Sequence, residues 1–221
     1  MIDPPVGEDV ASWGLVGAVV VKVGGSLLGW PELPGRLAGW LDAQRASGAP
    51  SADPVLIVIA GGGPFADAVR DLDRVHGLGD EAAHRLAIRS MDLTAALLAG
   101  LLPGSRLVAG RRELLASCRL GAVLVATPGP LLRDLDDAGP DPLPSSWDVT
   151  SDSIAARIAA RLGASRLVLL KSRPIADGAS LREAAAIGLV DPRFPEVAAG
   201  LRRIEVVSLR DPALPPSRLR P

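Results

Sequence analysis

The sequence predicts an α/β protein with a mostly parallel sheet and helices on both of its faces. Short runs rich in Val, Ile and Leu alternate with longer segments of helical periodicity along the 221 residues. This alternation is typical of strands joined by helical crossovers. Three of the apolar runs end in glycines or in a lysine followed by serine. Because ligands bind beyond the carboxyl ends of such strands, these three loops should meet at one edge of the sheet.

Composition excludes several classes of protein. The net charge is −1 and the pI is near 6.1, so no basic surplus points to nucleic acid or to an anionic membrane surface. The longest uninterrupted apolar run, residues 14–21, is too short to span a bilayer. The single cysteine, Cys118, cannot form an internal disulfide and suits a reducing compartment. We expect a cytoplasmic protein with no nucleic acid and no membrane as partner.

Strands are expected wherever a short apolar run is bounded by turn residues. The runs at 17–23 and 55–60 are continuous and end in glycine, which favours strands buried on both faces. The other strands are expected at 106–109, 122–126, 166–170 and 203–208.

Helices are expected between the strands. Residues 33–45 place their leucines and a tryptophan on one face, and Pro64 favours a helix start because proline suits the first turn. Asp80 can cap a long helix over 81–101, whose apolar residues cover so much of its surface that we expect it to lie at a homodimer or larger oligomer interface. Shorter helices are expected at 64–76, 112–117, 151–162, 181–186 and 196–201.

Proline-rich segments mark the expected loops and ends. Residues 127–146 contain five prolines and are expected to form one long loop. The segment 1–16 is expected to be an N-terminal extension of a single domain at 17–208, and the proline-rich tail at 209–221 is expected to fray.

All but two of the 24 basic residues are arginine, so each lysine is a candidate for a role that the planar guanidinium group of arginine cannot fill. Lys22 stands inside a valine-rich strand and precedes Gly24, Gly25 and Ser26, whose N–H groups and hydroxyl can hold phosphate oxygens. Alternatively, the stem of Lys22 packs on the sheet and its ammonium group reaches water. Lys171 ends a predicted strand, and the alternative for it is an ordinary solvated lysine.

Asp152 lies at the start of the predicted helix 151–162. It can act as an N-cap, or it can lie between the two ammonium groups as a permanently ionised carboxylate. The triple glycine at 61–63 can merely turn the chain. The chain has neither a GxxxxGK[ST] motif nor a GxGxxG motif after its first strand.

Three motifs occur in an order that resembles the amino acid kinase superfamily. They are VKVGGSL at 21–27, IAGGGP at 59–64 and TSDSIA at 150–155. Segments 79–87, 147–155 and 169–172 look most like a short branch that contains the [5-(aminomethyl)furan-3-yl]methyl phosphate kinase. The chain departs from longer members of the superfamily because its carboxyl-terminal part is brief and lacks their Gly-Gly-Met-x-x-Lys segment.

This resemblance implies an αβα sandwich that transfers the γ-phosphoryl group of ATP, with Mg²⁺ carried by the nucleotide. The acceptor would be a small phosphate monoester such as an aminomethylfuran phosphate of one-carbon cofactor biosynthesis. Residues 17–147 would bind the acceptor and 148–208 the nucleotide. The catalytic residues would be Lys22, Lys171 and Asp152. The phosphate- and nucleotide-binding residues would be Lys22, Gly24, Gly25, Ser26, Lys171, Ser172, Asp177 and Gly178. The acceptor-binding residues would be Gly61, Gly62, Gly63, Glu81, His84 and Ser151.

Glu81 and His84 are one turn apart at the start of the helix 81–101. Glu81 would attract an amine of the acceptor, and His84 would help the glycine amides to hold its phosphate. Alternatively, the two side chains form only a local pair at the helix start.

Three other functions stay open at this point. The chain can be a kinase of the same fold that acts on a carboxylate or on another phosphate. It can be a non-catalytic nucleotide-binding or storage protein. A dinucleotide-dependent oxidoreductase is disfavoured by the missing GxGxxG motif.

Overall fold

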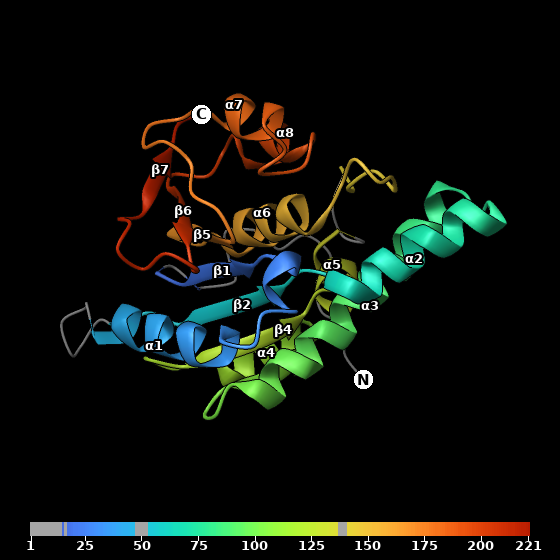
Figure 1. Cartoon of the computed structure of the whole chain (residues 1–221). Coiled ribbons are helices and arrows are strands. Elements are labelled where there is room, and N and C mark those ends of the chain that lie inside the picture. Colours follow the sequence, from blue (N-terminus) through green and yellow to red (C-terminus); the bar gives the residue numbers. More distant parts are fainter. Residues whose placement is uncertain (1–14, 16, 47–52, 137–140) are drawn as a thin grey trace.

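A seven-stranded sheet forms the centre of the computed structural model, which describes residues 15, 17–46, 53–136 and 141–221 (Figure 1). The strand order is β3-β4-β2-β1-β5-β6-β7. All neighbouring strands run parallel except β6 and β7, which are antiparallel. The strands are β1 (Val19–Val23), β2 (Leu56–Ala60), β3 (Arg106–Ala109), β4 (Val123–Thr127), β5 (Arg166–Lys171), β6 (Ile204–Ser208) and β7 (Ser217–Leu219).

Helices cover both faces of the sheet, which confirms the predicted three-layer αβα sandwich. The helices are α1 (Leu33–Ala46), α2 (Gly63–His76), α3 (Asp80–Leu101), α4 (Gly110–Ser117), α5 (Pro128–Asp136), α6 (Ser151–Leu162), α7 (Leu181–Ala186) and α8 (Phe194–Ala198), with a 3₁₀ turn at Gly25–Leu27. Helix α1 packs on one face and α4 to α8 pack on the other, whereas α3 contributes Ala95 and Leu98 to the first core and Met91 to the second.

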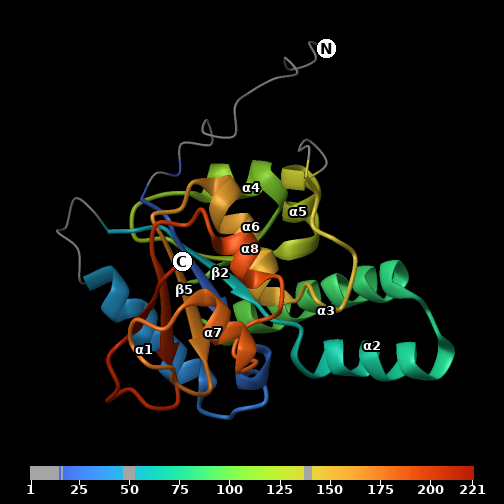
Figure 2. The same ribbon diagram turned by 90° about the horizontal axis from the view of Figure 1, so that it is seen from above.

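Helices α2 and α3 form a hairpin that extends beyond the sheet (Figure 2). No side chain of α2 is fully buried. On α3, Leu86, Leu93 and Leu97 are exposed, although the same helix buries Met91 and Leu98 against the sheet. The oligomer expected from this helix stays a prediction. None of the helices in the described parts of the chain is long and apolar enough to cross a membrane.

The alternation of side chains along β1 determines where the charged residue points. Val19, Val21 and Val23 belong to the core beneath α1 and α3, whereas Val20 belongs to the core beneath α6. Since successive side chains of a strand face opposite sides, Lys22 lies on the same side as Val20, facing α6.

The prediction of one long loop over 127–146 is wrong for the first half of this segment, where α5 forms. Two of its prolines, Pro128 and Pro130, occupy the first turn, where a missing N–H breaks no helical hydrogen bond. The carboxylate of Asp92 accepts a hydrogen bond from the Gly129 N–H at 2.8 Å and so supports this helix start. Buried leucines then hold α5 on the sheet.

The expected fraying of the carboxyl-terminal tail is also wrong. Strand β7 pairs with β6, and Leu219 is only 3% exposed. Hydrogen bonds from Arg220 N to Ala179 O and from Ser217 Oγ to Ile175 O attach the tail further. Prolines before β7 do not prevent this pairing because β7 lies at the edge of the sheet. The expected N-terminal extension lies outside the described residues except for Leu15.

Candidate active site

Two buried lysines share one buried carboxylate at the carboxyl ends of the central strands β1 and β5. Lys22 Nζ lies 2.7 Å from Asp152 Oδ1, and Lys171 Nζ lies 2.8 Å from both oxygens of Asp152. The ammonium group of Lys171 also donates to the Leu189 carbonyl at 2.6 Å. All three charged residues are at most 8% exposed. The alternatives of a Lys22 that reaches water and a solvated Lys171 therefore do not apply.

The charges of this cluster shift the pKa values of its members. Burial alone would raise the pKa of Asp152, but Lys22 and Lys171 outweigh it and hold that pKa below its usual value. Burial and the neighbouring Lys22 charge lower the pKa of Lys171 to about 8. With both lysines protonated, the cluster carries one net positive charge and attracts an anion.

Two glycine loops approach each other closely beside this cluster. A Cβ atom on Gly25 would lie 2.8 Å from the Gly63 nitrogen, and one on Gly61 would lie 2.8 Å from the Gly25 nitrogen. A Cβ atom on Gly62 would lie only 2.4 Å from that of Ala66. The loops after β1 and β2 therefore fit together only because they lack side chains, and the same lack lets a ligand approach their backbone closely.

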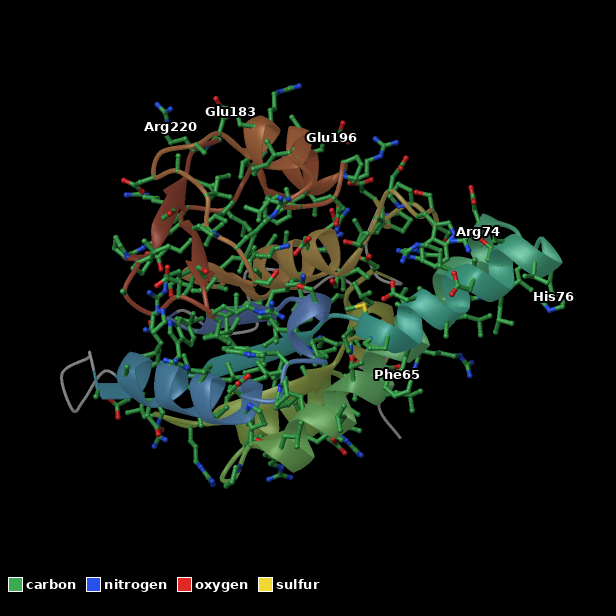
Figure 3. All side chains as sticks on the ribbon, in the orientation of Figure 1. Phe65, Arg74, His76, Glu183, Glu196 and Arg220 are labelled. Atoms are coloured by element: carbon green, nitrogen blue, oxygen red, sulfur yellow. The ribbon has the colours of Figure 1, made fainter. Side chains whose placement is uncertain are left out.

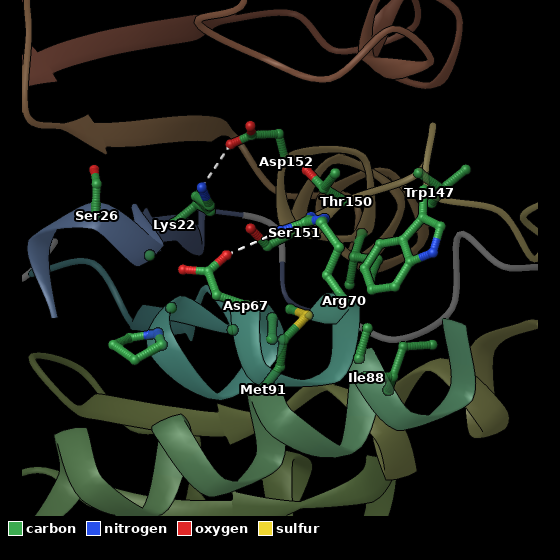
Figure 4. Close-up of a pocket in the computed structure, with 18 of the residues that line it drawn as sticks. Lys22, Ser26, Asp67, Arg70, Ile88, Met91, Trp147, Thr150, Ser151 and Asp152 are labelled. Carbon is green, nitrogen blue, oxygen red and sulfur yellow. Dashed lines mark hydrogen bonds and ion pairs between the residues drawn. The ribbon is translucent and has the colours of Figure 1, made fainter. Parts of the chain in front are cut away.

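A cavity of about 510 Å³ opens onto the cluster (Figure 4). Nine of the residues expected at the site line it. They are Lys22, Gly25, Ser26, Gly62, Gly63, His84, Ser151, Asp152 and Lys171. The structure therefore brings these nine residues together around one cavity, and their roles remain predictions.

Three further expected residues lie beside the cavity without lining it. Gly24 donates its N–H to Leu170 O at 2.9 Å, and Gly61 donates to Val23 O at 2.9 Å, so both fasten strand ends. The Ser172 hydroxyl accepts a hydrogen bond from Ser26 Oγ at 3.2 Å.

Glu81 does not lie where the sequence placed it. Its side chain is exposed and pairs with Arg85, and it does not line the cavity. His84, three residues later, is buried and does line it. Three residues rotate a helix by about 300°, which leaves Glu81 turned by about 60° from His84, toward solvent.

Asp177 and Gly178 also lie away from the cavity. Asp177 Oδ1 accepts a hydrogen bond from Arg218 N at 2.8 Å, and Gly178 N donates to Arg218 O at 2.9 Å. Arg220, which contacts the Gly178 carbonyl, lies across the molecule from α2 in Figure 3. These two residues attach β7 rather than line the cavity of Lys22, so the structure does not bring them to the expected nucleotide site.

Asp191 is a residue that sequence reasoning missed. Its buried carboxylate accepts hydrogen bonds from Thr150 N at 3.0 Å, Thr150 Oγ1 at 2.8 Å, Ser153 N at 3.0 Å and Ser153 Oγ. Thr150 is the N-cap residue of α6, so the N-cap alternative for Asp152 does not apply, and the Thr150 side chain makes no capping hydrogen bond to the helix. Asp191 caps α6 from a distant segment and leaves the carboxylate of Asp152 for the lysines.

Further residues line the outer part of the cavity, and no motif in the sequence predicts them as part of the site. Asp67 and Arg70 of α2 line it together with Trp147, and Ile88 and Met91 of α3 add an apolar wall. Within the described ranges, no group of three or more His, Cys, Asp or Glu side chains is placed to hold a metal ion.

Residues 17–174 match the model of the amino acid kinase family. The chain belongs to this family. The match confirms the resemblance carried by the three sequence motifs. It includes β1 and β5 with their lysines and the start of α6.

One curated protein has a partly similar sequence. A [5-(aminomethyl)furan-3-yl]methyl phosphate kinase of Methanocaldococcus jannaschii is 28% identical over 117 residues, which is 52% of this chain and 50% of that protein. The match thus spans about half of the curated relative.

Solved structures show the same fold. The uridylate kinase of Archaeoglobus fulgidus has a TM-score of 0.58 at 17% identity, covering 86% of this chain and 88% of that one. The UMP kinase of Ureaplasma parvum has a TM-score of 0.65 at 11% identity, covering 92% and 98%. The UMP kinase of Bacillus anthracis has a TM-score of 0.56 at 12% identity, covering 89% and 88%.

Replacing Asp191 tests its role at the start of α6. Asp191→Ala should lower the free energy of unfolding by at least about 3 kcal/mol, since several buried donors lose their acceptor at about 1–3 kcal/mol each. Asp191→Asn should cost less, because the amide keeps an accepting oxygen and its NH₂ can donate to Ser153 Oγ. Urea denaturation measures both variants. Equal stability of Asp191→Ala and wild type would show that Asp191 does not hold the helix.

Proposed function

We propose that the protein is a phosphotransferase that moves the γ-phosphoryl group of ATP to a small phosphate monoester, of the aminomethylfuran phosphate type. The observation that carries this proposal is the buried Lys22–Asp152–Lys171 cluster, whose net positive charge faces a cavity beside two glycine loops. The activity of the Methanocaldococcus jannaschii kinase, half of which is matched by this chain, supports the acceptor class.

In this proposal the protein acts mainly by positioning and by neutralising charge. Lys22 and Lys171 would contact the oxygens of the transferred group, and the N–H groups of Gly25 and Ser26 would complete its cradle. Such preorganised donors stabilise charge that develops in the transition state. Asp152 would orient the two ammonium groups and would be a poor general base, because its pKa is lowered.

The acceptor would provide its own nucleophile. An oxygen of its phosphate would attack the γ-phosphorus, the bond from that phosphorus to the bridging oxygen of ADP would break, and the products would be ADP and a diphosphate monoester. A phosphate is already ionised at neutral pH, so no side chain needs to remove a proton. Mg²⁺ would enter on ATP and add positive charge along its phosphates. The two carboxylates in the cavity wall, Asp67 and Asp152, are both paired with basic residues.

A second candidate is a binding or storage protein that holds a nucleotide or another anion at the same cluster without turnover. The cluster alone favours anion binding and is compatible with both functions. A kinase for another phosphate or for a carboxylate would use the same lysines with a different outer cavity.

Transfer assays with a panel of acceptors test the proposed function. We expect ADP release that depends on [5-(aminomethyl)furan-3-yl]methyl phosphate and exceeds that with uridylate, isopentenyl phosphate or acetylglutamate. Mass spectrometry should detect the diphosphate product. Good turnover of another acceptor alone would reject the proposed acceptor class. Tight ATP binding without turnover of any acceptor would favour the binding or storage protein.

Replacement of either lysine tests the cluster. Lys22→Ala and Lys171→Ala should each lower kcat by about a hundredfold or more, as expected for loss of one preorganised charge. Lys22→Arg and Lys171→Arg should also be impaired, because the guanidinium group is larger and planar. Circular dichroism would verify folding. Wild-type kcat in both arginine variants would show that the two lysines are incidental.

The pH dependence of kcat/KM for ATP tests the charge of Lys171. Its pKa is lowered to about 8, so a rise in pH through this value removes the proton and with it the positive charge. We expect kcat/KM to fall about tenfold per pH unit above about pH 8. The residual activity of Lys171→Arg should lack this fall, since arginine stays protonated. A profile that is flat to pH 9.5 in the wild type would contradict the assignment.

A further inference from the structure

The cavity has an outer part whose chemistry differs from that of the lysine cluster. Gly63, Asp67 and Arg70 line it from successive turns of α2. With a rise of about 1.5 Å per residue, Asp67 lies about 6 Å and Arg70 about 10 Å along the helix axis from the glycine loop. Figure 4 shows Asp67 between Lys22 and Arg70, with Trp147 beyond. A ligand with its phosphate at the lysines would reach Asp67 on extending along α2.

A chain of contacts holds the Asp67 carboxylate in this wall. Arg70 Nη1 donates to Asp67 Oδ1 at 2.9 Å, and the guanidinium group lies 4.5 Å from the centre of the Trp147 ring. The indole N–H of Trp147 in turn donates to Asp73 Oδ2 at 2.8 Å. Trp147 covers one face of Arg70, while the side chain of Asp67 is 70% exposed. The carboxylate is therefore the more accessible charge of this pair.

His84 provides a second hydrogen-bond acceptor. Its Nδ1 lies 3.1 Å from the Ser146 carbonyl oxygen, which can only accept, so Nδ1 carries a proton. Burial lowers the pKa of His84, and the neutral ring then has an unprotonated Nε2. An Nε2 lone pair cannot donate to a phosphate. The expectation that His84 holds the acceptor's phosphate is thus at odds with this geometry, whereas a donor group of the ligand fits it.

We propose that the outer part of the cavity binds a primary ammonium group of the acceptor, with Asp67 as its ionic partner and His84 as a hydrogen-bond acceptor. Ile88 and Met91 would pack against the carbon skeleton between this group and the phosphate. This inference rests on the proposed phosphotransfer and specifies its acceptor as an amine. It also replaces Glu81 by Asp67 as the residue that meets the amine.

The chain offers a matched control for Asp67. Asp71, one turn further along α2, forms the same kind of ion pair with Arg74, at 2.8 Å and with the same 70% exposure. Asp71 does not line the cavity, and Arg74 lies farther out along α2 (Figure 3). Asp67→Asn and Asp71→Asn therefore remove the same charge from the same helix, and only the first changes the cavity.

The experiment compares two acceptors, [5-(aminomethyl)furan-3-yl]methyl phosphate and its analogue with a hydroxyl in place of the amine. The wild type should prefer the amine in kcat/KM by about tenfold or more. Asp67→Asn should raise KM for the amine by about tenfold to a hundredfold, as expected for loss of a charge-assisted hydrogen bond. It should leave KM for the hydroxyl analogue and for ATP unchanged. Asp71→Asn should match the wild type with both acceptors.

Different results would overturn the ammonium site and the proposed phosphotransfer. Equal kcat/KM for both acceptors in the wild type, or an equal rise of both KM values in Asp67→Asn, would overturn the ammonium site while phosphotransfer stands. Absence of transfer to both acceptors, and to every other phosphate ester tested, would overturn the proposed function and the ammonium site together. Asn has nearly the same volume as Asp, and thermal unfolding would verify that both variants fold.

Discussion

One net positive charge is buried where Lys22 and Lys171 share the carboxylate of Asp152. Burying a charge without a partner is costly, and one carboxylate can balance only one of two ammonium groups. Burial lowers the pKa of Lys171, and the charge of Lys22 lowers it further. An anion in the adjoining cavity would balance the remaining positive charge. Strand pairing and the packing of helix α6 on the sheet bring these distant segments together and place the cluster beside the cavity.

The sheet accounts for the geometry of the cluster. Lys22 is in register with Leu169 of the adjacent parallel strand, and Lys171 is two residues further on, hence on the same face. Helix α6 covers that face and presents Asp152 to both lysines. The segment that contains Leu189 and Asp191 supports this arrangement. The Leu189 carbonyl accepts a hydrogen bond from Lys171, and the Asp191 carboxylate accepts hydrogen bonds from the start of α6.

Local patterns in the sequence predict the parts that depend on local chemistry. The carboxyl ends of parallel strands lie at the same edge of a sheet. Valine-rich runs predict the strands, and the glycines and the two lysines at their ends therefore predict which residues meet there. Contacts between distant segments lack such a signal. Asp191 reaches Ser153 across 38 residues, and β7 is held by pairing with β6. Glu81 was misplaced because spacing along a helix does not say how that helix is rotated against the sheet.

A crystal structure with a non-hydrolysable ATP analogue and Mg²⁺ tests the central claim most directly. The account predicts that oxygens of the terminal phosphate lie within hydrogen-bond distance of Nζ of both Lys22 and Lys171 and of the N–H groups of Gly25 and Ser26. Asp152 would remain between the lysines. A terminal phosphate bound elsewhere, with both lysines still paired only with Asp152, would contradict it.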